Sequence, residues 1–181
     1  LGHFAWRGKP LPVAERQKQG GGVITGSAGA FLVLEEAEHA RARGAKPYAR
    51  LKAIESDLGA RDETATRTRL ANLLDKIAPQ PGTAVISGAT GSTGITDLEF
   101  EALRERLGKD VAMRAFNTMI GNPVEANFPA GVALAALALY HGGFYPPFEE
   151  AEKPVAAAPS SVLVSSIGHY RGEGFGLLEK I

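Results

Sequence analysis

The sequence predicts an α/β fold in which helices cover a largely buried sheet. Apolar, β-branched runs of strand length alternate along the chain with stretches of helical periodicity, which is typical of layered α/β proteins. One helical stretch, Val124–Tyr140, is rich in alanine and has small residues on nearly every side. Such a helix is expected between packed layers, because it has no polar face to turn toward water.

Composition limits the classes of function. The 181 residues are enough for one domain with a hydrophobic core, and 44% hydrophobic and 22% charged residues are ordinary for a globular protein. The 20 basic and 20 acidic residues balance, so no basic face for nucleic acid is predicted. The longest apolar run, Ala130–Tyr140, is about half of the ~20 residues that a membrane helix needs. No basic-then-apolar leader follows Leu1, so we expect a cytoplasmic protein, and a first residue other than Met suggests a fragment or a processed product.

The chain contains no cysteine. Disulfides, thiolate metal sites and a cysteine nucleophile are therefore excluded within these residues. Glu35, Glu36 and Glu38 form an acidic cluster, but their spacing suits helical ion pairs with Arg41 and Arg43. No metal site is predicted.

The first part of the chain is predicted to hold an arm, two strands and a short helix. Residues 1–22 are rich in glycine, proline and charge and are expected to be an irregular arm. Val23–Leu34 is apolar and broken by small residues, which predicts two buried strands joined by a tight turn. Glu35–Gly44 has acids first and bases last, as the helix dipole favours, and it ends on a glycine.

Strands and helices then alternate. Helical spacing predicts Asp62–Ile77, with Asp62 as its cap, and Asp97–Leu107, with Thr96 as its cap. The expected strands, in chain order, are Tyr48–Ser56, Thr83–Ser87, Val111–Phe116 and, after a Pro/Ala linker, a closing pair at Ser161–Gly168 and Gly174–Ile181.

The stretch "VISGATGSTG" raises the alternative of a nucleotide-binding loop. Gly88, Gly91 and Gly94 are three residues apart and stand between a strand and a helix, which is the order that a dinucleotide site needs. However, about half the chain precedes them, no acidic residue ends the next strand, and no Tyr-x-x-x-Lys pair follows. A turn of small residues packed against other backbone is the favoured interpretation, so no cofactor is predicted.

Four segments, in order, resemble the C-terminal half of β-ketoacyl-[acyl carrier protein] synthases, the condensing enzymes of fatty-acid and polyketide synthesis. The most specific is "GSAGAFLVLEEAEHARARGAKPYARL", which is close to the family's "GEGAG-VLVLEE-EHA-ARGA--YAE" block. The others are "SGATGSTGITDLEFEALRERLG", "FNTMIGNPVEANFPAGVALAALALYHGGFYPPF" and "VSSIGHYRGEGFGLLEKI". The resemblance implies a thiolase-like layered fold (α-β-α-β-α) made of two halves, of which residues 23–181 supply mainly the C-terminal one.

The resemblance also places the family's catalytic groups on residues that cannot replace them. The family uses a cysteine as acyl acceptor, two histidines for decarboxylation and a lysine that holds the second histidine. The histidines fall on Ala89 and Asn122 and the lysine on Asn117, so no competent catalytic residue is expected. The bulky Phe128 is expected to narrow the acyl channel. The residues expected along the substrate tunnel are Met119, Asn122, Phe128 and His169.

The implied function is that of a non-catalytic subunit, similar to the chain-length factors of polyketide synthases, which shapes the acyl tunnel of a catalytic condensing partner. The implied partners are a catalytic β-ketoacyl synthase subunit, the chain's own N-terminal half and an acyl carrier protein. One alternative is part of an active synthase, an acyltransferase, whose nucleophile lies in the N-terminal half. The other alternative is an NADP-binding reductase that uses the glycine loop.

Overall fold

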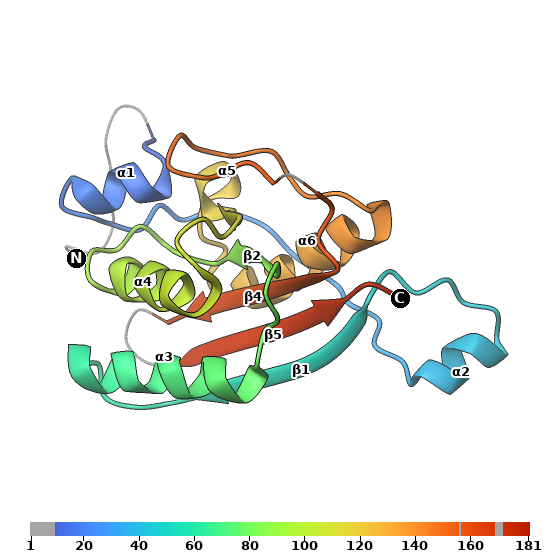
Figure 1. The fold of residues 1–181 in the computed structure, drawn as a ribbon. Coiled ribbons are helices and arrows are strands. Elements are labelled where there is room, and N and C mark those ends of the chain that lie inside the picture. Colours follow the sequence, from blue (N-terminus) through green and yellow to red (C-terminus); the bar gives the residue numbers. More distant parts are fainter. Residues whose placement is uncertain (1–9, 156, 169–171) are drawn as a thin grey trace.

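The residues that the structure describes, 10–155, 157–168 and 172–181, form a five-stranded mixed sheet with helices on both faces, as the computed structural model shows (Figure 1). In their order across the sheet, the strands are β1 (Arg50–Asp57), β5 (Glu173–Glu179), β4 (Ser161–Ile167), β2 (Ala84–Ser87) and β3 (Met113–Ala115). The helices are α1 (Val13–Lys18), α2 (Ala37–Ala42), α3 (Glu63–Ile77), α4 (Ile95–Leu107), α5 (Asn117–Ile120), the 3₁₀ turn η1 (Val124–Ala126) and α6 (Asn127–His141). The predicted α/β layered fold is confirmed.

The sheet combines parallel and antiparallel pairs. The closing strands β4 and β5 pair antiparallel, as predicted, and β1 pairs antiparallel with β5. Strand β2 lies parallel to both β4 and β3 and places Ser87 opposite Ser165. The turn after β2 therefore lies beside the middle of the sheet, where it is enclosed by several elements.

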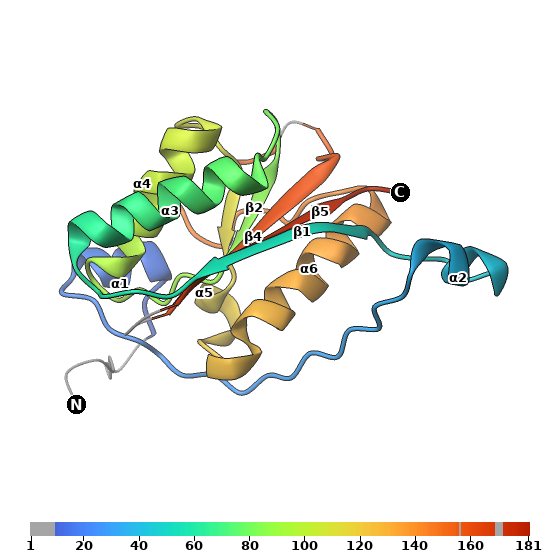
Figure 2. The same cartoon turned by 90° about the horizontal axis from the view of Figure 1, so that it is seen from below.

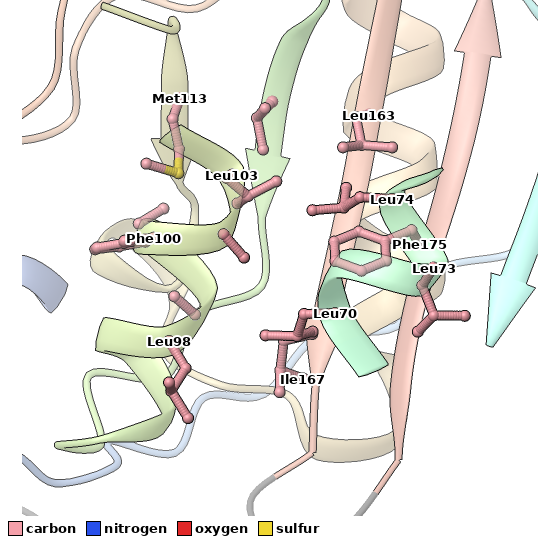
Figure 3. Packing of buried hydrophobic residues seen from close by; sticks show 14 of the residues in the cluster. Leu70, Leu73, Leu74, Leu98, Phe100, Leu103, Met113, Leu163, Ile167 and Phe175 are labelled. Atoms are coloured by element: carbon pink, nitrogen blue, oxygen red, sulfur yellow. The ribbon is translucent and has the colours of Figure 1, made fainter. Parts of the chain in front are cut away.

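Two hydrophobic cores lie on opposite faces of the sheet. Helices α3 and α4 cover one face and α6 covers the other, as Figure 2 shows. Successive side chains of β4 alternate between these cores, since Leu163 packs on the α3 and α4 side while Val162 and Val164 pack on the α6 side. Figure 3 shows the first core, in which the leucines of α3 lie against Phe175 of β5. Burial on both faces explains the uninterrupted apolar run in β4.

Helix α6 lies very close to the sheet. A side-chain carbon at Gly131 would lie 2.7 Å from Cγ1 of Val164 on β4, so a glycine is needed at this crossing. The predicted alanine-rich helix is confirmed, but its regular part begins at Asn127, after the 3₁₀ turn. Within the described residues no helix, α6 included, is long and apolar enough to cross a membrane.

Helices α3 and α4, which cover the face opposite α6, begin at different kinds of cap. The Asp62 carboxylate accepts the amide of Ala65 at 2.8 Å, so the predicted cap of α3 is confirmed. Helix α4 begins at Ile95 instead of Asp97, and the carboxylate of Asp97 accepts the amide of Gly94 at 3.1 Å. Thr96 is therefore not the cap. Its hydroxyl instead accepts the amide of Gly91 at 3.1 Å and fixes the preceding loop.

The N-terminal arm is not irregular throughout, because it contains α1. Arg16 of this helix is buried, and its guanidinium donates to the carbonyls of Leu11, Gly22 and Thr90 at 2.5, 2.8 and 2.8 Å. These bonds join α1 to the loop after β2, about 75 residues away in sequence. The sequence of the arm gives no local signal for such a long-range contact. The proposed domain boundary after residue 22 stays a prediction.

The prediction of two buried strands in Val23–Leu34 is wrong for this chain. The segment forms only isolated bridges, at Val23 and at Thr25, which pairs with Asn122, and Phe31 is fully exposed. A strand forms only where another strand offers an edge to pair with. The sheet ends at β1 and β3, and neither edge pairs with this segment.

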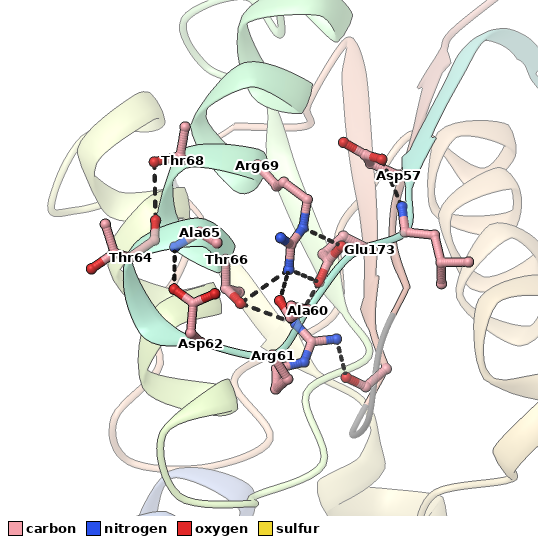
Figure 4. Close-up of polar contacts among 12 residues, drawn as sticks. Asp57, Ala60, Arg61, Asp62, Thr64, Ala65, Thr66, Thr68, Arg69 and Glu173 are labelled. Carbon is pink, nitrogen blue, oxygen red and sulfur yellow. Dashed lines mark hydrogen bonds and ion pairs between the residues drawn. The ribbon is translucent and has the colours of Figure 1, made fainter.

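An ion cluster joins β5 to the start of α3. The side chain of Glu173 is fully buried and pairs with Arg61 and, at 3.1 Å, with Arg69 (Figure 4). Both arginines also bond to main-chain carbonyls, of Gly168 and Ala60 respectively. A buried carboxylate is stable only with such partners, so the cluster fixes the loop before α3 against the β4–β5 hairpin.

Candidate functional site

The turn after β2 is the centre of the predicted site, and its first residue, Gly88, has no room for a side chain. Ala89 is buried, and the amide of Gly88 donates to the carbonyl of Ser165 at 2.9 Å. A side-chain carbon at Gly88 would lie 2.5 Å from Nδ2 of Asn127 and 2.8 Å from that same carbonyl. The turn therefore presents only backbone and one methyl group.

Two buried asparagines close this turn. Nδ2 of Asn117 donates to the carbonyls of Gly88 and Ala89 at 2.9 and 3.1 Å, and to Oδ1 of Asn127 at 3.1 Å. Nδ2 of Asn127 donates to the carbonyl of Gly88 at 3.0 Å and to Oγ of Ser166 at 3.3 Å. An amide can donate hydrogen bonds but cannot act as a general acid or base near neutral pH. The network can hold the turn, but it cannot transfer a proton.

Asn127 and Ser166 were not recognised in the sequence. The available signal was an asparagine at the start of an otherwise apolar helix, where a buried polar group requires a partner. Asn117, by contrast, was singled out, and the structure places it beside Ala89.

Asn122 lies in a different local environment. Its main chain bonds to Ile24 and Gly26 at 2.8 and 2.9 Å, and its side-chain oxygen accepts the amide of Val124 at 2.8 Å. This side-chain oxygen therefore stabilises its own turn. Among the described residues, no hydrogen bond joins Asn122 to the Asn117–Asn127 pair.

The predicted tunnel residues do not converge on one hollow. Met119 on α5 is exposed, whereas Phe128 is partly buried between α6 and β5. A side-chain carbon at Gly176 of β5 would lie 3.0 Å from the Phe128 ring, so the ring fills the space above that glycine. His169 lies outside the described residues.

The structure has a hollow of about 600 Å³ between the first turns of α3 and α4, away from these residues. Its charges are paired, since Arg67 bridges Glu63 at 3.1 Å and Glu101 at 2.8 Å. A smaller hollow of about 120 Å³ lies beside β3. Neither hollow contains Met119, Asn122 or Phe128.

Amides and carbonyls of the glycine loop already form hydrogen bonds with other groups of this chain. Its amides at Ala89, Gly91, Ser92 and Gly94 donate to side-chain oxygens of β2, of the same loop and of α4. Its carbonyls at residues 90 and 91 accept from Arg16 and from the amide of Gly22. A phosphate cradle needs free amides that point at the ligand. The geometry therefore argues against the NADP alternative.

A buried carboxyl group, that of Glu99 on α4, lies beneath the turn. One of its oxygens accepts hydrogen bonds from the hydroxyls of Ser87 and Ser165, each at 2.6 Å. Burial raises the pKa of Glu99, and its two serine hydrogen bonds oppose that rise. The other oxygen, Oε2, is buried without a hydrogen-bond partner among the described residues. Nothing in the sequence marks Glu99 as buried, because its position on α4 looks like that of any surface glutamate.

The acidic residues at the start of α2 follow the prediction only in part, because Glu36 caps the helix and its carboxylate accepts the amides of Glu38 and His39. Glu35 pairs with Arg43 at 2.5 Å, although the predicted pairing also included Arg41. No group of three or more potential metal ligands occurs among the residues that the structure describes.

The architecture and the solved structures that share it define the class of protein. The chain matches the ishigamide ketosynthase/chain length factor with a TM-score of 0.79 and 22% identity, over 99% of this chain and 49% of that one. It also matches a chain in the structure of a type II polyketide synthase acyl-carrier protein in complex with its ketosynthase bound to the hexaketide. The TM-score is 0.63 and the identity is 19%, over 81% of this chain and 42% of that one. The chain forms part of a thiolase-like ketosynthase fold, since it covers less than half of each of these matched chains.

Sequence comparison gives the particular relationship. No family model matches the chain. It is 32% identical over 145 residues to oxytetracycline polyketide β-ketoacyl synthase 1 of Streptomyces rimosus, which covers 74% of this chain and 34% of that protein. The chain is homologous to part of this synthase, and it spans about a third of the length of this curated relative.

Proposed function

We propose that the protein is a non-catalytic, ketosynthase-like subunit that shapes the acyl tunnel of a catalytic condensing partner in polyketide or fatty-acid synthesis, in the cytoplasm. The single observation that carries the proposal is the turn after β2. Gly88 and Ala89 are enclosed there by the Asn117–Asn127 amide pair, and neither amide can act as a general acid or base near neutral pH. The sequence contains no cysteine, so a cysteine acyl acceptor would have to come from outside these residues.

The proposed partners are a catalytic ketosynthase subunit, an N-terminal half and an acyl carrier protein. The outer face of α6 supports a packed partner, because Asn127–Tyr140 contains no charged residue while Leu137 and Tyr140 are exposed. An uncharged, partly exposed helix face is typical of an interface. Solved relatives include a ketosynthase/chain length factor and a ketosynthase with its acyl-carrier protein, which supports the other two partners.

Phe128 is the residue that we propose sets the tunnel length, with Met119, Asn122 and His169 as further lining residues. The support is its position, since the Phe128 ring fills the space over Gly176 between α6 and β5. A smaller side chain there would leave a cavity that an acyl chain could enter.

The test is co-expression with an intact synthase encoded beside it, followed by mass spectrometry of the acyl products. Phe128→Leu is expected to shift the products toward longer chains by a unit or two, because the side chain loses several carbon atoms. The matched control is Phe148→Leu, since Phe148 packs against the same core from the segment that covers β3. Unchanged products from a stable Phe128→Leu complex would contradict the proposal.

A second candidate is part of an active synthase whose nucleophile lies outside this chain. The observation that favours it is the name of the Streptomyces rimosus relative, which is that of a synthase. Transfer of a radiolabelled acyl group from acyl carrier protein, lost on Asn122→Ala or His169→Ala, would select this candidate over the first.

A further inference from the structure

The smaller hollow, of about 120 Å³ beside β3, has an apolar floor. Phe100 of α4 and Met113 of β3 are almost fully buried and lie next to each other there (Figure 3), and Val111 and Ala115 extend the same floor. Exposed residues form its rim, so the hollow opens to the surface. A dry cavity of about 150 Å³ can hold a benzene molecule, so this hollow has room for most of one compact apolar group.

Three cations from three separate segments surround the mouth of the hollow. Arg104 comes from α4, Lys109 from the turn after this helix, and Lys153 from the segment 144–153. Among the described residues, none of the three forms an ion pair. The Arg104 guanidinium lies over the Phe100 ring, 5.4 Å from its centre. This contact holds the guanidinium at the edge of the apolar floor.

The end of a helix explains only part of this arrangement. Cations are expected near the C-terminus of α4, because the helix dipole is negative there, and this accounts for Arg104 and Lys109. Lys153 has no such reason, since the segment that carries it is not helical. Its main-chain carbonyl accepts the buried Arg114 guanidinium at 2.9 Å, which fixes the backbone from which the Lys153 side chain extends.

Two carboxyl groups also line the hollow, but both are bonded to the protein. The oxygens of Glu149 accept the amide of Ala14 at 3.0 Å and the Thr118 hydroxyl at 3.3 Å. Glu152 accepts the amide of Ala115 at 2.7 Å, so the outer edge of β3 is blocked. These carboxyl groups therefore serve to fasten the segment 144–153 and α1 to the sheet.

The charge around the hollow is positive. Arg16 attracts the Glu149 carboxylate, and Nε of Arg114 lies 3.7 Å from the Glu152 carboxylate, so each acid is offset by a buried arginine. Burial also raises the pKa of both glutamates, which favours their neutral form. The remaining acidic residues of these segments do not line the hollow. The three rim cations are therefore left without a counter-charge.

We propose that the hollow beside β3 binds a small organic anion, a monocarboxylate whose compact apolar body lies on the floor and whose carboxylate meets Arg104, Lys109 and Lys153 at the rim. Guanidinium and ammonium groups bind a carboxylate through charge-assisted hydrogen bonds. The floor adds a contribution from apolar burial, which favours an organic over an inorganic anion. The inference goes beyond the proposed function and does not depend on it, because the described tunnel residues do not line this hollow.

The test is a ligand-observed NMR titration with benzoate, on the protein purified through a tag on this chain together with any subunit that it holds. Benzamide has the same ring without the charge, and acetate has the charge almost without a body. Each is expected to bind about tenfold more weakly than benzoate, or worse. Arg104→Gln is expected to weaken benzoate binding about tenfold. The matched control is Arg106→Gln, an exposed arginine of the same helix that does not line the hollow and should leave binding unchanged.

Ala151→Trp tests the hollow itself. Ala151 is exposed on the rim, so a large side chain there should fill the hollow and abolish binding while the three cations stay in place. The urea midpoint of each variant shows that it still folds.

Three outcomes would overturn the inference: no benzoate binding at millimolar concentration, equal binding of acetate or benzamide, or benzoate binding that Arg104→Gln and Lys153→Gln both leave unchanged. Benzoate binding together with unchanged products from Phe128→Leu would support this inference and contradict the proposed function, so the two can fail separately.

Discussion

Glu99 is a carboxyl group in the interior, held by two serine hydroxyls that come from neighbouring parallel strands. Its burial raises its pKa, so the folded protein keeps the proton at a pH at which the unfolded chain releases it. Its stabilising contribution is therefore complete in acid, below the ordinary pKa of a glutamate. It is lost as the pH rises through the raised pKa.

We expect Glu99→Gln to flatten the pH dependence of stability. The amide stays neutral, so the variant should lose about 1–3 kcal/mol in acid, through poorer hydrogen bonding, and should gain on the parent as the pH rises. Urea unfolding at a series of pH values measures this difference. The control is Glu105→Gln, an exposed residue of the same helix. A constant difference between parent and Glu99→Gln at all pH values would show that Glu99 does not titrate in this way.

Helix α6 shows how one element is positioned by a single small residue. Gly131 allows the helix to approach Val164 on β4, and Val164 is fully buried with a side chain that has little rotamer freedom. The position of α6 in turn places Asn127 under the turn after β2.

Gly131→Ala is expected to destabilise the protein by about 1–3 kcal/mol. Alanine favours a helix over glycine by about 1 kcal/mol, but here its methyl group would overlap Val164. Thermal or urea unfolding measures the loss. Adding Val164→Ala should restore part of it, because the two residues are in contact. If the double variant were simply the sum of two losses, the close contact would not be the cause.

For single elements, the sequence predicts helices well but does not show whether an apolar segment has a strand to pair with. The apolar face of α3 and its Asp62 cap are local features, so both are confirmed in the structure. The strand character of 23–34 depends on a neighbouring edge, which no local pattern contains. The Asn117–Asn127 contact likewise depends on the close approach of α6 to the sheet, which no local pattern contains. Of the residues at this turn, the sequence therefore indicated Asn117 and Ala89 but not Asn127.

The described residues form one sheet with a hydrophobic core on each face, and the outer face of helix α6 is left uncovered. Helices α3 and α4 close one side, while the outer face of α6 has no covering layer among the described residues. A layered fold buries such faces against another element. The molecule is therefore expected to associate through α6.

Leu137→Lys is expected to reduce self-association of the isolated chain and to prevent assembly with the proposed N-terminal half. The charge would stay in water in the free chain but would be buried in the complex. Sedimentation velocity measures both effects. Ile54→Lys, on the exposed side of β1, is the control. An assembled complex that tolerates Leu137→Lys would show that the partner binds elsewhere.

The blocked edge of β3 has a consequence for how far assembly can proceed. Glu152 accepts the amides of Ala115 and Phe148, and the Arg114 side chain donates to the carbonyls of Tyr145 and Lys153, so the segment 144–153 is fastened over the strand. A half-domain with two open edges could polymerise end to end into fibres. Because its own chain covers one edge of the sheet, end-to-end growth through both edges is not expected for this molecule.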